Sequence, residues 1–399
     1  MTRFSAALPR LIEAGRAEDD DRFEEASREF DVALSHGVSS AELFFKGARS
    51  AARAGALDRA FAHLESLRAV GIADPRAFDV GVELDALRPD ARWGPFVSRI
   101  REESARAGER SAPRIVTSDI DHFWSAFDLV KAGARDPEAV VAREYVDRAS
   151  PALQGFFPRR IGAISDLLLA IDYYGRYYES VRPNTLRVRD LEPELRRIFR
   201  RMKEVLPDAV FPDVTFVVGR LKTAGTATAD GLLVGLEQVS RAPDSPVEGM
   251  PLRQQQIVLP FDVLPHLVAH ELTHVQQHFA EEESLLAIAL LEGGADFVAE
   301  LTSGGTTNPA LMRYGDAHEA ALWAELHADR RSTDEDVIAR WAWGNEATDE
   351  RPGDLAYYVG YRIVRAYYER HTDKRQALRD ILDVADPEAF LAASAYSPR

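Results

Sequence analysis

The chain has 399 residues, 46% of them hydrophobic and 29% charged, which is the composition of a globular protein that can bury a sizeable core. Its formal net charge of −16 argues against binding to the phosphate backbone of nucleic acids and to anionic membrane surfaces. It contains no cysteine, which excludes disulfide frameworks, thiol nucleophiles and cysteine-ligated metals. A metal site in this chain must therefore use His, Asp and Glu.

The sequence pattern of residues 1–110 predicts a series of helices, and this part is the first of two expected domains. Small and apolar residues recur in this part at an interval of 34, the period of tetratricopeptide repeats, whose helices cross closely at small residues. Residues 5–72 therefore resemble a pair of degenerate tetratricopeptide repeats, although Ala51 and Ile72 stand where that pattern has a tyrosine and a proline. An alanine-rich bundle with accidental periodicity is the alternative. The recurring residues are Ala14, Ala26, Phe30 and Ala33, followed by Ala48, Ala60, Leu64 and Leu67.

Because about three repeats are needed for a stable array, we expect the repeats to pack on further helices at 74–87 and 93–108, before a polar linker at 104–114.

The second expected domain covers residues 115–399. The fold class that we expect is α+β and mostly helical, with a helical-repeat domain first and a domain with a small β-sheet second. The second domain predicts helices at 119–132, 137–149, 160–180 and 190–204, strands at 214–218, 231–236 and 256–259, a loop at 223–228, and helices from about 263 onward.

A five-residue segment, His270-Glu271-Leu272-Thr273-His274, contains the residues most indicative of chemistry. On a helix, residues four apart face the same way, so His270 and His274 can hold one zinc ion between them. Glu271 follows the first histidine and can reach a water bound to that ion. This is the HExxH arrangement of metalloproteases.

The residues around this segment predict a helix with two different faces. Histidines recur every four residues from 266 to 278, and apolar residues at helical spacing from 264 to 279 form a second stripe. The pairs 266/270 and 274/278 have the same spacing as 270/274. Only the 270/274 pair has a glutamate in the catalytic position, so we expect it to bind the metal.

A catalytic zinc needs a third protein ligand and an open position for water. Eighteen residues after His274, the segment Glu292-Gly293-Gly294-Ala295-Asp296 falls on a predicted helix over 284–302. Its two carboxylates are four residues apart and share a face. One of them can bind the metal while the other accepts the ring N–H of a ligating histidine. The small residues Gly293, Gly294 and Ala295 leave room where this helix is expected to approach the histidine helix, the predicted helix that carries His270 and His274.

These two segments together resemble the gluzincin metallopeptidases. The resemblance implies that Glu292 is the third zinc ligand and that Asp296 supports a ligating histidine. The stretches 216–235 and 357–364 are also similar to a bacterial family known as predicted zinc-dependent proteases of unknown function, which is related to gliding-motility lipoproteins and whose members are often exported. The resemblance covers about residues 190–370.

The predicted chemistry gives a role to each group. Glu271 acts as the general base that takes a proton from the metal-bound water. A further donor must stabilise the oxyanion that develops on the substrate. Tyr361 is the candidate for this role, with His318 and His327 as alternatives. Because Tyr361 also belongs to an apolar helical stripe, a purely structural role is the competing interpretation.

The sequence thus predicts a zinc-dependent peptidase that acts on peptide or protein substrates, with the helical repeats as a surface for a protein partner. The alternatives are a binding protein whose metal site is structural or inactive, and a zinc hydrolase of non-peptide amides. The longest apolar run, 285–291, is too short to span a membrane. Pro9 and Arg10 interrupt the N-terminal apolar stretch, so we expect a cytoplasmic protein, or an exported one if a signal has been removed.

Overall fold

The protein is described by a computed structural model that covers residues 3–72, 78, 82–110, 113–278, 284–343, 348 and 351–398. Over these residues the fold is α+β and mostly helical, with a four-stranded mixed sheet, as the sequence predicts. The chain divides into two compact units, Met1–Glu179 with Pro212–Glu237 and Ser180–Phe211 with Gln238–Arg399. These units do not divide at 110–115, where the sequence places its domain boundary.

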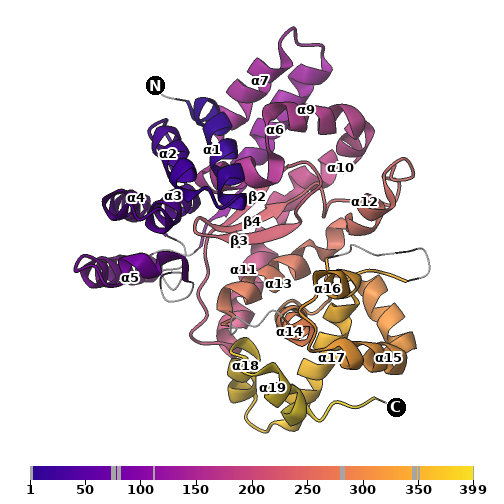
Figure 1. Ribbon diagram of the computed structural model, residues 1–399. Coiled ribbons are helices and arrows are strands. Elements are labelled where there is room, and N and C mark those ends of the chain that lie inside the picture. Colours follow the sequence, from indigo (N-terminus) through magenta and orange to yellow (C-terminus); the bar gives the residue numbers. More distant parts are fainter. Residues whose placement is uncertain are drawn as a thin grey trace. The chain divides into compact units, whose positions relative to one another are not determined.

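The N-terminal helices pack in the sequential pairs that a 34-residue repeat requires (Figure 1). All eight recurring residues are at most 2% exposed, and the five alanines among them let neighbouring helices approach closely. Gly55 makes the turn between the third and fourth helices with a positive φ of 72°, which glycine adopts without strain. These elements are α1(Phe4–Asp19), α2(Phe23–Leu34), α3(Ala41–Arg53) and α4(Leu57–Val70).

Two further elements cover the repeats, as expected. The 3-10 helix η2(Val82–Leu87) and α5(Trp93–Arg110) share a buried core with α3 and α4. Half of the predicted helix at 74–87 lies outside the described residues, which include Phe78 and η2. Because α5 continues to Arg110, the predicted linker from 104 is wrong over its first seven positions.

The sheet belongs to the first unit and has the strand order β1-β2-β4-β3. Neighbouring strands are parallel except for β3 and β4, which form an antiparallel hairpin. Both β2 and β4 are buried along their whole length, which explains their mainly apolar sequence. The strands are β1(Ile115–Val116), β2(Val214–Val217), β3(Gly225–Thr228) and β4(Gly231–Gly235).

Two of the three predicted strands are confirmed, and the third is wrong. Residues 252–257 form a short helix, α12(Leu252–Ile257), and only an isolated bridge joins Arg241 to Pro260 after it. Conversely, the predicted loop at 223–228 contains β3. Its small residues show no apolar alternation because it is an edge strand that pairs on one side only.

The turn between β3 and β4 is tied to a helix of the same unit. The Asp230 carboxylate accepts the N–H groups of Ala41 (2.7 Å) and Glu42 (3.3 Å) at the start of α3. Burial raises the pKa of Asp230 to about 6, even though these hydrogen bonds favour its charged form. The hairpin therefore caps α3 from a distant part of the sequence.

The predicted helix at 119–132 is confirmed at 118–131, whereas the α-helix predicted at 137–149 ends at Glu144. Gly162, with a φ of 90°, ends one helical stretch, so the predicted helix at 160–180 is broken. The elements of the first unit are α6(Ser118–Lys131), α7(Pro137–Glu144), η3(Val146–Arg148), α8(Pro151–Phe156), the π-helix η4(Phe157–Ile161) and α9(Ile164–Tyr173). The helix α10(Gly175–Arg187) contains the boundary at 179/180, and η5(Val188–Leu191) belongs to the second unit.

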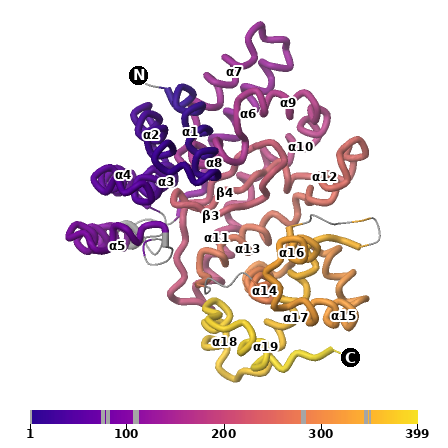
Figure 2. The backbone as a smooth tube through the Cα atoms, in the orientation of Figure 1, coloured from indigo at the N-terminus to yellow at the C-terminus, as the bar shows by residue number. Residues whose placement is uncertain are grey.

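The second unit is built around α14(Leu285–Ser303), which packs on α13(Leu264–Gln276) and most extensively on α17(Leu355–Arg370) (Figure 2). The predicted helix at 284–302 is thus confirmed. Among the described residues, no helix is both long enough and apolar enough to cross a membrane. The other elements of this unit are α11(Glu192–Val205), η6(Phe261–Val263), α15(Pro309–Asp329), α16(Glu335–Trp341), α18(Lys374–Leu382) and α19(Pro387–Ser394).

Candidate metal centre

The histidine helix has the two faces that the sequence predicts. Pro265 lies in the first turn of α13, where a missing N–H costs no hydrogen bond. Leu264, Val268 and Leu272 are fully buried on one side. The other side carries the histidines toward α14, so the apolar stripe anchors the helix and orients its polar face.

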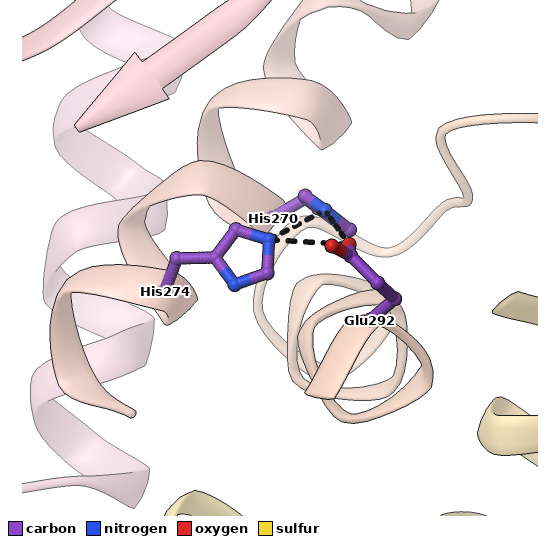
Figure 3. A group of neighbouring side chains, drawn as sticks. All are labelled: His270, His274 and Glu292. Carbon is purple, nitrogen blue, oxygen red and sulfur yellow. Dashed lines mark hydrogen bonds and ion pairs between the residues drawn. The ribbon is translucent and has the colours of Figure 1, made fainter. Parts of the chain in front are cut away.

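The side chains of His270 and His274 from α13 and of Glu292 from α14 converge at one point and form the metal-ligand cluster (Figure 3). The Nε2 atoms of His270 and His274 are 3.0 Å apart. Oε2 of Glu292 lies 3.4 Å from the first and 3.3 Å from the second. Ligand atoms about 2.0–2.1 Å from a tetrahedral zinc lie about 3.3–3.4 Å from one another. The three atoms therefore fit the ligand triangle of a zinc site.

The outer nitrogen of each histidine is held by an oxygen acceptor. Nδ1 of His270 lies 2.9 Å from Oδ1 of Asp296, which also accepts the hydroxyl of Thr307 at 2.9 Å. Nδ1 of His274 lies 2.6 Å from Oε1 of Gln277. Because both Nδ1 atoms donate, both Nε2 atoms keep a lone pair for a metal.

The charges of the cluster support each other without an ion. Although burial favours the neutral form of Glu292, the charge of His274 and hydrogen bonds from both histidines hold its pKa well below its usual range. Burial likewise opposes the charged forms of the histidines, yet Asp296 raises the pKa of His270 and Glu292 raises that of His274. Protons therefore compete with a metal for this site.

Glu271 lies beside the cluster but outside its hydrogen-bond network. Its carboxylate makes no hydrogen bond to any residue that the structure describes, and burial raises its pKa while the two neighbouring imidazoles lower it. A buried carboxylate without a donor accepts a proton more readily than a solvated one. This is the property that a general base requires.

The other two histidines of the stripe have different partners. His266 bonds to Ser303 through Nδ1 at 2.8 Å, and burial lowers its pKa. His278 is exposed beyond the end of α13. Neither joins the described cluster of metal-ligand atoms, so 270/274 is the pair that the structure combines with a carboxylate.

Tyr361 does not point its hydroxyl at the cluster. That hydroxyl bonds to Glu300 and accepts Arg365 at 3.4 Å. Tyr357, one turn earlier, instead stacks on the ring of His270, with centroids 6.2 Å apart and planes 8° apart. Tyr357 is thus the tyrosine next to the metal-ligand atoms.

His318 and His327 lie exposed on α15. His318 bonds to the carbonyl of Tyr314 at 2.8 Å, and His327 packs against Trp323. Both contacts are within α15, so neither histidine has a partner in the cluster.

The glycines between Glu292 and Asp296 serve two different contacts. A Cβ on Gly293 would lie 2.1 Å from the backbone N of Tyr361, so this glycine lets α14 cross α17 and not the histidine helix. The expectation that it makes room for α13 is wrong. A Cβ on Gly294 would lie 3.2 Å from the Nε2 atom of Gln277, just beyond the end of α13.

Three features of the site are not predicted by the sequence: the contacts of Thr307 and Gln277, and the stacking of Tyr357 on His270. Only the position of Gln277, three residues after a ligating histidine, offered a local hint. The other two come from later helices and loops, which sequence spacing does not relate to the motif.

The family of the chain is shown by its match to a family model described as Gliding motility protein GldB, which covers residues 163–398. This range includes both helices of the metal-ligand cluster. No curated protein and no solved structure matches the chain. The chain belongs to the gliding motility protein GldB family.

Proposed function

We propose that this member of the gliding motility protein GldB family is a zinc-dependent peptidase that hydrolyses peptide bonds with Glu271 as general base. The observation that carries the proposal is the triangle of His270, His274 and Glu292 ligand atoms, with both histidine Nδ1 atoms held by oxygen acceptors. The family's description refers to gliding motility and names no reaction, so support for hydrolysis comes from the site.

The number of ligands favours a catalytic metal over a structural one. Structural zinc sites use four protein ligands, whereas catalytic sites use three and leave a position for water. The described residues supply three such ligands. Glu271 adds a carboxylate that is adjacent to them and that has no hydrogen bond of its own among these residues. A structural site has no use for such a group.

Each group of the site has a separate role in the proposed hydrolysis. Zinc bound at this site would lower the pKa of a water molecule toward neutrality and polarise a carbonyl group. Glu271 would accept the proton of the attacking water and deliver it to the departing amine. Tyr357 replaces Tyr361 as our candidate for the donor to the developing oxyanion, because its hydroxyl makes no hydrogen bond within the described residues and its ring lies against His270.

The proposal is tested with Glu271→Gln. The amide cannot accept a proton from water, so the variant should keep its zinc and lose peptide hydrolysis. Cleavage is measured on an unbiased peptide library, with a chelator-treated sample of the native chain as the metal-free control. Undiminished turnover in the variant would remove Glu271 as the base, and hydrolysis of small amides but not peptides by the native chain would favour a non-peptidase amide hydrolase.

A further inference from the structure

Gln277 links the two helices that carry the metal ligands. It is the first residue after α13, with an extended backbone (φ −75°, ψ 140°) that ends the helix. Its Oε1 atom lies 2.6 Å from Nδ1 of His274, and its Nε2 atom donates to the carbonyl of Leu291 at 2.7 Å. Leu291 directly precedes Glu292, so one amide group joins the second histidine to the backbone beside the third ligand.

The contact with Leu291 determines which way the amide points. A backbone carbonyl only accepts hydrogen bonds, so the NH₂ group of Gln277 must face Leu291 and its oxygen must face His274. An amide oxygen only accepts, so His274 must carry its proton on Nδ1. The lone pair of Nε2 then faces Glu292, 3.3 Å away. The chain of three groups leaves His274 a single neutral tautomer, the one that can bind a metal at this point.

Gly294 makes room for this amide. A Cβ at that position would lie 3.2 Å from Nε2 of Gln277, which is tighter than ordinary van der Waals contact. A side chain at 294 would therefore press on the amide that bonds to Leu291. The glycine that precedes Ala295 and Asp296 thus has a specific neighbour, and that neighbour is Gln277.

We propose that Gln277 is a positioning residue of the metal centre, which fixes the tautomer of His274 and ties that histidine to the helix that carries Glu292. Gln277 acts through His274 and does not itself bind the metal. The inference rests on the metal site of the proposed function and not on its hydrolytic reaction.

The experiment measures the affinity of the full chain for Zn²⁺ by competition with a chromophoric chelator, together with the absorption spectrum of the Co²⁺ form. Gln277→Met keeps the size of the side chain but removes its acceptor and donor. We expect it to weaken Zn²⁺ binding about 10–100-fold. It should also change the Co²⁺ spectrum, because His274 is then free to change tautomer and ring orientation.

Two further variants separate positioning from folding. Gln277→Glu keeps an acceptor for Nδ1 of His274, but it loses the donor to Leu291 and places a carboxylate beside that carbonyl. It should therefore keep the native spectrum and lose less affinity than Gln277→Met. Gln276→Met is the matched control, because the Gln276 amide bonds to the backbone of Val210 and Leu272 and not to a histidine. It should leave both measurements unchanged.

The outcomes distinguish this inference from the proposed function. Native affinity and a native spectrum in Gln277→Met would overturn the role of Gln277, and a Co²⁺ spectrum in Gln277→Glu as altered as that of Gln277→Met would overturn its action on the tautomer of His274. A native chain that binds neither metal would overturn the inference together with the metal site. A native chain that binds zinc and cleaves no peptide would overturn the peptidase proposal and leave the assignment of Gln277 in place.

Discussion

A hydrogen-bonded chain from Thr307 through Asp296 to His270 predicts graded effects on zinc binding. Asp296→Ala removes the acceptor of the His270 Nδ1 proton, which lies 2.9 Å away, and leaves the ring free to turn. Loss of such a supporting carboxylate typically costs about 10–100-fold in metal affinity, or about 1.4–2.7 kcal/mol. Removal of Glu292, which supplies a ligand atom itself, should cost more than that.

Thr307→Val sets the lower end of the same series. Valine keeps the shape of the side chain and removes one hydrogen bond onto Oδ1 of Asp296, while the bond from Asp296 to His270 remains. A hydrogen bond of this kind contributes about 0.5–1.5 kcal/mol, so we expect a loss of affinity of roughly 2–13-fold. The loss of zinc affinity should therefore become smaller as the altered group lies farther from the metal.

The assay is the affinity of each variant for Zn²⁺, from competition with a chromophoric chelator at constant pH. The expected order of losses is Glu292→Ala, then Asp296→Ala, then Thr307→Val. A larger loss in Asp296→Ala than in Glu292→Ala would show that the two carboxylates have exchanged roles. Negligible losses in both would place the segment 292–296 away from the metal and leave the third ligand unidentified.

Three further predictions concern catalysis, pH and packing. Tyr357→Phe should keep zinc and lower kcat by about 10²–10³-fold if its hydroxyl stabilises the oxyanion, and a larger loss in Tyr361→Phe would reverse the assignment. Burial raises the pKa of Glu237 from 4.5 to about 7, so the folded state holds this proton more tightly than the unfolded state. The contribution of Glu237 to the free energy of unfolding is fully present below pH 4.5 and falls by about 3 kcal/mol as pH rises to 7. Urea unfolding as a function of pH should show this decline in the native chain and not in Glu237→Gln. An identical decline in both proteins would contradict the prediction. Gly360→Ala places a Cβ 1.7 Å from the carbonyl oxygen of Ala289 and should lower the unfolding free energy by about 3 kcal/mol or more. In the control Gly94→Ala, the added Cβ has nothing within 4 Å, so the unfolding free energy should rise by up to about 1 kcal/mol. Equal effects of the two substitutions would mean that α14 and α17 are not closely packed at Gly360.

The parts of the fold that the sequence predicts correctly are those with local causes. The spacing of His270 and His274 is a property of one helix, so the pair follows from the helical repeat alone. The buried strands β2 and β4 are mainly apolar runs, in which Thr215 is the polar side chain. The eight residues of the 34-residue period are all buried positions of the N-terminal helices. Each of these patterns depends on residues within one element or on its next repeat.

The errors occur where a distant neighbour decides the local structure. The edge strand β3 has little apolar character of its own and depends on its pairing with β4. The apolar residues near 256–259 resemble a strand but lack a partner ladder, and residues 252–257 form a helix. Gly293 approaches Gly360 on a helix some sixty residues later, which no spacing rule connects to the motif.

The candidate site shows the same division. The sequence alone identified His270, His274 and Glu292 as candidate metal ligands, because the side-chain types and the four-residue spacings on α13 and α14 are local properties. Only the tertiary structure decided which groups hold those ligands in place. Thr307 reaches His270 through Asp296, and Tyr357 stacks on His270 from α17. Gln277 lies beside His274 in the sequence, but its second bond, to Leu291 of α14, forms only when α13 and α14 pack together. The direction of a hydrogen bond and the tautomer of a histidine depend on those contacts, so the fold and not the motif sets the chemistry of the centre.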